Sequence, residues 1–353
     1  MVRPQSGLSP ARRPRRFGGY LRPLANRNGS HAHIRPPARA RFAVTAPAIS
    51  VVMPAFNRAR EIRGAIDSVL HQTWTDFELI VVDDCSTDDT VSAVEAVEDP
   101  RVRLVRHEAN AGGAAARNTG IRAARAPWIA FQDSDDEWLP RKLELQRAAL
   151  ERCGPDAVGV YCGMIILGRP EADRVDPELV EYWPRAGADA VLEGDLSTSL
   201  LRNGSLISTQ TFMGRRDALL AVGGFDAALK ALQDWDCFIR VARHGPIAFA
   251  PDPLVIQRFS PNSLTKSSRN RVIALERILE KNADAFQAMP DVLAMRAAMA
   301  AGGFRRVGEL RRALPWMLRA LRLRPFRWRS WVGLGLLLAA ALAGPFRRGG
   351  AGG

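Results

Sequence analysis

Apolar residues in the first half of the chain fall into short runs that alternate with segments of helical pattern. The apolar runs are residues 48–53, 77–82, 102–105 and 128–131. Helical patterns lie between them, over residues 61–72, from about Asp88 onward, and over residues 111–124. Strands and helices that alternate through short links predict a parallel sheet with right-handed crossovers.

The fourth apolar run ends in a cluster of acidic residues. Asp133, Asp135 and Asp136 place three carboxylates within four residues. Like charges repel at this spacing, which costs free energy unless a cation lies among them. Mg²⁺ and Mn²⁺ prefer oxygen ligands of this kind, so one interpretation is a metal site. The alternative is a solvated turn before the next helix.

Polar residues also close the first and second runs. Pro54 to Asn57 follow the first run, and Asp83 and Asp84 follow the second. In parallel sheets, ligands bind beyond the carboxyl ends of the strands. We therefore expect these residues and the acidic cluster to face one crevice.

Four segments resemble, in order and at similar spacing, the motifs of family 2 glycosyltransferases. They are residues 51–57 (VVMPAFN), 81–88 (VVDDCSTD), 112–120 (GGAAARNTG) and 133–136 (DSDD), and the resemblance runs from about Ile49 to Arg240. It implies an inverting enzyme with the GT-A fold, an α/β, Rossmann-like mixed sheet flanked by helices. It also implies a nucleotide-sugar donor, often a UDP-sugar, and a divalent metal, Mn²⁺ or Mg²⁺.

By motif position, the resemblance assigns nucleotide-sugar binding to Pro54, Phe56, Asn57 and Asp84. Phe56 would stack on the base, and Asp84 would accept a hydrogen bond from a base N–H. The alternative for Phe56 is packing in the core.

The same resemblance places Arg117 at the nucleotide or its diphosphate, which a guanidinium binds well. Asp133 would contact the ribose or help to hold the metal, and Asp135 would bind the metal directly. Asp136 would support the site from outside or cap a helix. The alternative for Arg117 is a surface ion pair.

Asp234 is the expected catalytic residue. A helix is predicted from about Trp235, and family 2 enzymes usually have Glu-Asp just before it, where the Asp is the general base. This chain has Gln233 and Asp234 at these positions. Asp234 would take the proton of an acceptor hydroxyl as its oxygen attacks the anomeric carbon. In the alternative interpretation, Asp234 and Asp236 only stabilise the helix start through its dipole.

Histidine supplies a further metal ligand in some family members, but the corresponding segment here, residues 258–265, contains none. We interpret His71, His107 and His244 as structural. The metal would then be held by carboxylate and diphosphate alone.

Charge is distributed unevenly along the chain. Residues 1–47 contain ten arginines and no acidic residue, and residues 302–353 contain eleven arginines and one glutamate. Since the whole chain carries +13 and each end carries +10, the middle carries −7. The acidic middle argues against a nucleic-acid partner, although the overall charge favours one. Four cysteines without a Cys-x-x-Cys pair, and no apolar signal segment, predict a cytoplasmic protein.

We expect four segments along the chain. Residues 1–47 are rich in Pro, Gly and Arg and are predicted to be disordered, or to precede the true translation start. Residues 48–165 would bind the nucleotide-sugar, and residues 166–265 would complete the sheet on the acceptor side. Residues 266–353 would form a helical C-terminal region.

The chain end has the pattern of a membrane interface. Residues 307–323 are amphipathic, and Arg327 and Trp328 then lead into the apolar residues 332–346. This apolar run is shorter than the ~20 residues that span a bilayer. Flanking Arg and Trp suit a membrane surface, so we expect peripheral contact with the inner face of the cell membrane. The alternative is a helix buried against the catalytic domain.

Together these patterns predict a glycosyltransferase that moves a sugar to a hydroxyl of a glycan or lipid-linked acceptor in bacterial-type surface polysaccharide synthesis. One alternative is a nucleotidyltransferase, which would also use carboxylates and metal but would attack phosphorus and release pyrophosphate. The other is a catalytically silent protein that binds nucleotide-sugars.

Overall fold

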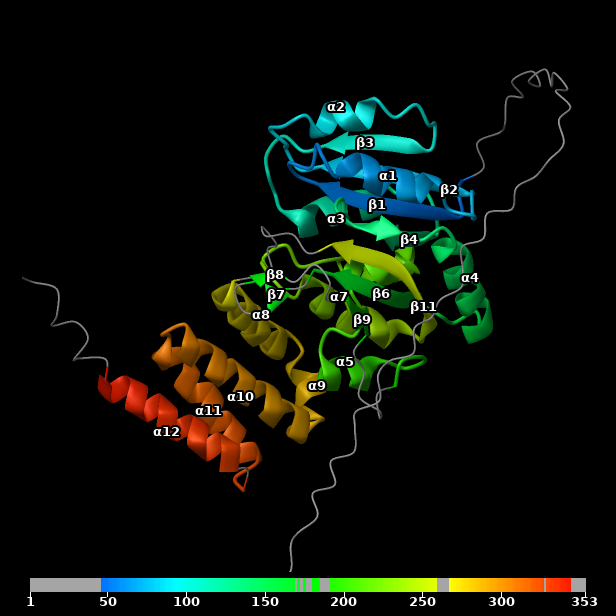
Figure 1. The fold of residues 1–353 in the computed structure, drawn as a ribbon. Helices are drawn as coiled ribbons and strands as arrows, with labels where there is room; N and C mark the ends of the chain where they lie inside the picture. The colour runs from blue at the N-terminus through cyan, green and yellow to red at the C-terminus, as the bar shows by residue number, and fades with distance from the viewer. Residues whose placement is uncertain are drawn as a thin grey trace, which may run out of the picture. The chain divides into compact units, whose positions relative to one another are not determined.

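A mixed β-sheet forms the centre of the chain in the computed structural model (Figure 1). The structure describes residues 46–168, 170–171, 174–175, 180–184, 191–258, 267–326 and 328–343, so the segment predicted to be disordered lies almost wholly outside it. The strands are β1 (Ile49–Ala55), β2 (Phe77–Asp83), β3 (Val102–Arg106), β4 (Trp128–Phe131), β5 (Glu137–Trp138), β6 (Gly159–Leu167), β7 (Pro170–Glu171), β8 (Arg174–Val175), β9 (Val180–Trp183), β10 (Phe212–Arg215) and β11 (Ile247–Arg258).

Nine of the described strands belong to one sheet, in the order β3-β2-β1-β4-β10-β6-β11-β5, with β9 paired to β6. The first four strands of the chain are parallel, as the alternating pattern predicted. Strand β10 then runs antiparallel between β4 and β6, which makes the sheet mixed. The expected boundary at residue 165 falls inside β6, so the two expected halves share this sheet.

Helices follow the strands at the expected places. Those of the sheet region are α1 (Ile62–Leu70), α2 (Thr90–Glu95), α3 (Gly113–Ala123), α4 (Lys142–Cys153), α5 (Ser197–Asn203), α6 (Arg216–Ala221) and α7 (Gln233–Val241), with 3-10 turns η1 (Thr209–Thr211) and η2 (Ala242–His244). The C-terminal helices are α8 (Ser268–Lys281), α9 (Ala283–Gln287), α10 (Pro290–Arg306), α11 (Leu310–Leu323) and α12 (Trp328–Ala343).

The sheet is buried on both faces, and its strands alternate between two cores. In β1, Val51 and Met53 pack into the core that α1 and α4 cover, whereas Val52 packs into the core with α3 and α7. Helix α3 approaches β1 closely, because a Cβ on Gly120 would lie 2.3 Å from Cγ1 of Val52. Glycine at this position therefore allows the C-terminal half of α3 to pack closely against the middle of β1.

The C-terminal helices continue the core that contains α7. Apolar residues of α8, α10, α11 and α12 join the same cluster as Phe225 and Trp235, and examples are Ile278, Phe304, Trp316 and Leu337. Their burial stabilises the sheet region and the C-terminal helices together. Among the described helices, none combines the length and apolar character needed to cross a membrane.

Candidate active site

The loops after β1 and β2 are joined by hydrogen bonds. Asn57 has φ 51°, and its backbone N–H donates to Oγ of Ser86 at 3.0 Å. The backbone N–H of Thr87 donates in return to Oδ1 of Asn57 at 2.8 Å. These contacts hold residues 54–57 beside the end of β2. Phe56 is 43% exposed there, which rules out the core-packing alternative and leaves its ring free to stack on a ligand.

Asp84 is buried beside the glycine-rich turn that precedes α3. Its carboxylate accepts backbone hydrogen bonds from Ala111 at 2.9 Å and Gly112 at 2.7 Å, and Oδ1 lies 2.8 Å from Nδ1 of His107. Gly112 has φ 87°, a conformation that favours glycine. Because a carboxylate has about four acceptor positions, one remains for a further donor. His107 also contacts Oγ1 of Thr119, which is a structural role of the kind expected for it.

Arg117 and Asp133 meet although they follow different strands. A guanidinium N–H of Arg117 donates to Oδ1 of Asp133 at 2.6 Å, and the Arg117 side chain is only 13% exposed. The pair is therefore not a surface ion pair. Nε of Arg117 is buried and has no hydrogen-bond partner within the described residues, so this guanidinium retains a free donor.

Asn118, which follows Arg117 in α3, joins this helix to the loop before α7. Its side-chain amide donates to the carbonyl of Phe225 at 2.7 Å, and its Oδ1 accepts from the Phe225 N–H at 2.8 Å. The loop approaches so closely that a Cβ on Gly224 would lie 2.2 Å from Oδ1 of Asn118. Gly224 also has φ 67°, so two constraints favour glycine there.

The acidic cluster is partly buried and is not a solvated turn. Asp135 is 30% exposed and lies 3.6 Å from a guanidinium nitrogen of Arg58. Burial, followed by the charge of Asp133, raises the pKa of Asp135, while Arg58 opposes the rise. Burial raises the pKa of Asp136 more strongly, with further repulsion from Asp133 and Asp135. Residue 137 begins strand β5, so Asp136 does not cap a helix.

The donor set of Asp133 and Asp135 fits a divalent metal that is held jointly with a diphosphate. Mg²⁺ is bound in many proteins by one or two carboxylates together with substrate phosphates and water. Within the described residues, no group of three or more His, Cys, Asp or Glu side chains could hold a metal by itself. Residues 259–266, which include most of the segment without histidine, lie outside the described residues.

Asp234 lies in the first turn of α7, within electrostatic reach of the Arg117–Asp133 pair. Its Oδ1 accepts from the backbone N–H of Trp235 at 2.8 Å. Burial raises the pKa of Asp234; that hydrogen bond and the charge of Arg117 lower it, and the charge of Asp133 raises it further. The fold thus brings Asp234 near enough to Arg117 and Asp133 for their charges to act on its carboxylate. Gln233 stands where family members usually have Glu. Its side-chain amide donates to the carbonyl of Leu229 at 2.5 Å.

The family profile described as Glycosyl transferase family 2 matches residues 50–220, which carry the strand-end loops and the acidic cluster. The chain belongs to glycosyltransferase family 2. Its fold is similar to that of S. aureus TarS residues 1–349 in complex with UDP-GlcNAc, with a TM-score of 0.59 at 18% identity over 85% of this chain and 92% of that one. The GT-A architecture predicted from the motifs is therefore confirmed.

Several curated relatives of this family 2 glycosyltransferase come from bacteria. An uncharacterized glycosyltransferase of Haemophilus influenzae is 27% identical over 66% of this chain and 76% of its own length. The putative colanic acid biosynthesis glycosyl transferase WcaA of Escherichia coli is 31% identical over 55% of this chain and 66% of its own.

A third relative carries a more specific name. The Escherichia coli UDP-Glc:alpha-D-GlcNAc-diphosphoundecaprenol beta-1,3-glucosyltransferase WfgD is 44% identical over 28% of this chain and 39% of its own length. The alignments to WcaA and WfgD thus span less than two thirds of those relatives.

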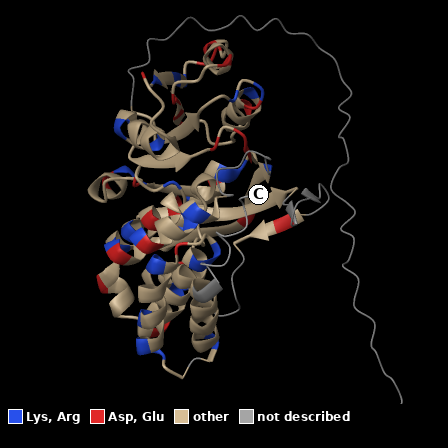
Figure 2. Ribbon diagram, turned by 90° about the vertical axis from the view of Figure 1, so that its left-hand side faces the viewer, with Lys and Arg blue, Asp and Glu red and all other residues tan. Residues whose placement is uncertain are grey.

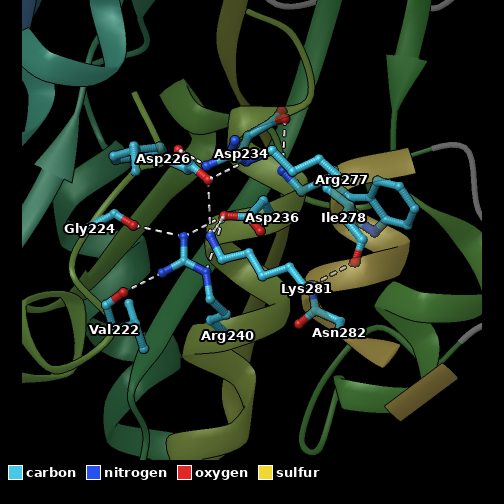
Figure 3. Close-up of polar contacts among 12 residues, drawn as sticks. Val222, Gly224, Asp226, Asp234, Asp236, Arg240, Arg277, Ile278, Lys281 and Asn282 are labelled. Atoms are coloured by element: carbon cyan, nitrogen blue, oxygen red, sulfur yellow. Dashed lines mark hydrogen bonds and ion pairs between the residues drawn. The ribbon is translucent and has the colours of Figure 1, made fainter. Parts of the chain in front are cut away.

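Asp236, two residues beyond Asp234, has a different environment in this glycosyltransferase. It is fully buried, and its Oδ2 pairs with a guanidinium nitrogen of Arg240 at 2.5 Å and with Nζ of Lys281 at 3.0 Å (Figure 3). Lys281 also reaches Asp226 at 3.3 Å. The sequence alone does not indicate a role for Lys281, because only the i,i+4 spacing of Asp236 and Arg240 is visible along the chain. Asp236 is therefore held in a buried ion-pair network that joins α7 to α8.

Proposed function

We propose that this family 2 glycosyltransferase moves a sugar from a nucleotide-sugar, with a UDP-sugar as the expected donor, to a hydroxyl of an acceptor with inversion at the anomeric carbon. The observation that carries the proposal is the position of Asp234. It lies in the first turn of α7, partly exposed, and the charges of Arg117 and Asp133 act on it. A carboxylate so placed is suited to take a proton next to a bound diphosphate.

Asp234 acts as the general base. It accepts the proton of the acceptor hydroxyl as that oxygen attacks the anomeric carbon from the face opposite the leaving group. The bond between the anomeric carbon and the diphosphate oxygen breaks, and the nucleoside diphosphate departs with the bonding electrons. Burial, which raises the pKa of Asp234, makes its ionised form a stronger base than an exposed aspartate.

The donor is held by the loops after β1 and β2. Phe56 stacks on the base, and the remaining acceptor position of Asp84 receives a base N–H. Pro54 and Asn57 shape the loop between them, which the hydrogen bonds from Asn57 to Ser86 and Thr87 fix in place. Arg117, whose Nε is buried without a hydrogen-bond partner within the described residues, donates to a phosphate oxygen.

Asp135, with help from Asp133, would hold Mn²⁺ or Mg²⁺ against the diphosphate. A metal bound there supplies positive charge that offsets the charge on the leaving nucleoside diphosphate. Arg58 then serves as the counter-ion of Asp135, which is partly buried.

The acceptor is proposed to be a glycan or a lipid-linked sugar of bacterial surface polysaccharide synthesis. This follows the names of WcaA and WfgD, which refer to colanic acid and to a sugar on diphosphoundecaprenol. The proposed place of reaction is the cytoplasmic face of the membrane, where such lipid-linked acceptors are accessible to a cytoplasmic enzyme.

A two-stage experiment tests the proposal. First, thermal shift with UDP, GDP and several nucleotide-sugars, each with Mn²⁺ or with EDTA, identifies the donor. Second, the donor is incubated with acceptors, and the released product is analysed. Release of the nucleoside diphosphate with a β-linked product from an α-linked donor supports an inverting transferase. Release of pyrophosphate would favour a nucleotidyltransferase, and binding without turnover on any acceptor or on water would favour a silent binding protein.

A further inference from the structure

One face of helix α12 is apolar and exposed. Five large side chains form it, and we call them the outer face of α12: Trp328 (67% exposed), Trp331 (54%), Val332 (50%), Leu336 (48%) and Leu338 (52%). At about 100° per residue, these positions fall within an arc of roughly 160° on one side of the helix. Phe326, in the preceding turn, is 98% exposed. Monomeric soluble proteins seldom leave so many large apolar side chains together in water.

The opposite side of α12 fixes the helix to the protein. Ser330 and Leu337 are buried, and a Cβ on Gly333 would lie 2.6 Å from Cε of Met317 in α11. Leu337 also belongs to the same core cluster as Trp316 and Met317. The buried-helix alternative is therefore correct for one side of α12 only, and the described part of the chain leaves the outer face uncovered.

Arginines accompany this face along the chain. From residue 310 to the end, the sequence contains nine arginines and no acidic residue. Among them, Arg322, Arg324 and Arg329 are exposed in the structure. Figure 2 marks the basic and acidic residues along these C-terminal helices. Anionic lipid headgroups complement such a surface, and tryptophan is enriched where a membrane meets water.

The length of α12 decides between lying on a membrane and crossing it. Its 16 residues measure about 24 Å at ~1.5 Å per residue, whereas the hydrocarbon core of a bilayer is ~30 Å thick. A second copy of this chain fits the outer face less well. Two copies would bring their arginines together, without any acidic residue in this region to pair with them.

We propose that the outer face of α12 docks on an anionic lipid bilayer, with the helix axis in the plane of the surface and the arginines at the headgroups. The docking proposal extends the proposed function, and its biological role rests on that function. A docked α12 would present the active site to acceptors in that membrane. The docking itself requires no catalysis and can be tested separately.

The test is co-flotation of the full-length protein with vesicles of phosphatidylcholine alone or with one quarter phosphatidylglycerol. The wild type should float with the anionic vesicles, bind the neutral vesicles at least about fivefold less, and lose binding as salt rises. Trp331→Ser combined with Leu336→Ser should reduce binding about tenfold or more, since it removes two large apolar groups. Leu220→Ser, which changes an exposed leucine of α6, is the matched control and should bind like the wild type.

Three outcomes would overturn the proposal. They are absence of vesicle binding by the wild type, equal binding to neutral and anionic vesicles, and unchanged binding by the double variant. Light scattering would show whether a second copy covers this face instead, as concentration-dependent association that the double variant abolishes. Hydrolysis of the nucleotide-sugar without vesicles should be the same in both proteins, so loss of docking is distinguishable from failure of the proposed transferase activity.

Discussion

The two sides of the candidate site are held in different ways. On the donor side, the loops after successive strands hold one another, as in the contacts of Asn57 with Thr87 and of Asp84 with Gly112. On the side of the proposed catalytic base, Asp234, the contacts come from the C-terminal helices, because Lys281 of α8 reaches Asp236 in α7. The C-terminal helices thus have two parts. Helix α8 supports the candidate site, and α12 presents the exposed apolar face.

A second contact from the C-terminal helices strengthens this comparison. Arg296 of α10 is buried, stacks 4.8 Å from the centre of the Trp235 ring, and donates to the carbonyls of Leu201 and Arg202 at the end of α5. Burial lowers the pKa of Arg296 to about 10, so it remains charged at neutral pH. Trp235, which follows Asp234, therefore contacts α10, and Asp236 contacts α8.

The largest expected effect separates Asp234 from its neighbours. Asp234→Asn should lower kcat by roughly 10²–10⁴-fold, the usual contribution of a general base, and leave the donor Kd nearly unchanged. Asp217→Asn, at an exposed carboxylate in the first turn of α6, is the matched control and should retain full activity. Steady-state kinetics and calorimetry measure both quantities. Normal turnover by Asp234→Asn would show that another group is the base.

The next effect tests the donor side. Asp135→Asn should lower transfer by roughly 10²–10³-fold, as expected when an electrostatic contact to the leaving group is lost. It should also abolish the difference in UDP affinity between Mn²⁺ and EDTA. Titration calorimetry of the wild type and the variant under both conditions checks this. If the wild type binds UDP equally well in Mn²⁺ and EDTA, Asp135 has no role through a metal.

The contact between α8 and α7 should have a smaller effect. Lys281→Ala leaves the buried Asp236 with Arg240 as its cation, so the start of α7 should shift and kcat should fall about tenfold while the donor KM stays constant. Lys281→Arg should restore most of kcat. Arg269 lies on α8, as Lys281 does, and forms a 2.7 Å ion pair with Glu309, the residue before α11. Arg269→Ala breaks this pair and serves as the control. Equal loss of kcat in Arg269→Ala and Lys281→Ala would mean that α8 acts only through overall stability.

The smallest effect is a shift in pH dependence. The proposed mechanism requires ionised Asp234, so it predicts that kcat falls as pH drops through the pKa of this group. Because burial raises that pKa, the acid limb should lie above the ordinary range of an aspartate. A pH profile of kcat at saturating donor measures it, with Asp234→Asn expected to lack the limb. An acid limb of the same position in Asp234→Asn would assign it to a different group.

Local patterns in the sequence determined the strands and helices of the first half of the chain, because these elements depend mainly on residues that are close together in the sequence. The alternation of apolar runs and helical segments predicted β1 to β4 and the helices between them, because strand and helix periodicity are local properties. The acidic residues after β4, together with the rule that parallel strands end at one edge, predicted which loops meet. The order of four motifs then predicted the family and the GT-A fold.

Tertiary structure alone decided the contacts that join distant segments. Asp234 and Asp236 look alike in the sequence, yet Asp236 forms an ion pair with Lys281, because the packing of α8 brings that lysine to it. Asp84 accepts hydrogen bonds from the turn before α3, and Asp136 is buried instead of capping a helix. In α12 the sequence is apolar almost all round, so its pattern could not predict which face packs against α11 and which remains exposed. Such outcomes depend on how whole elements pack, and no local periodicity encodes the partner of a given side chain.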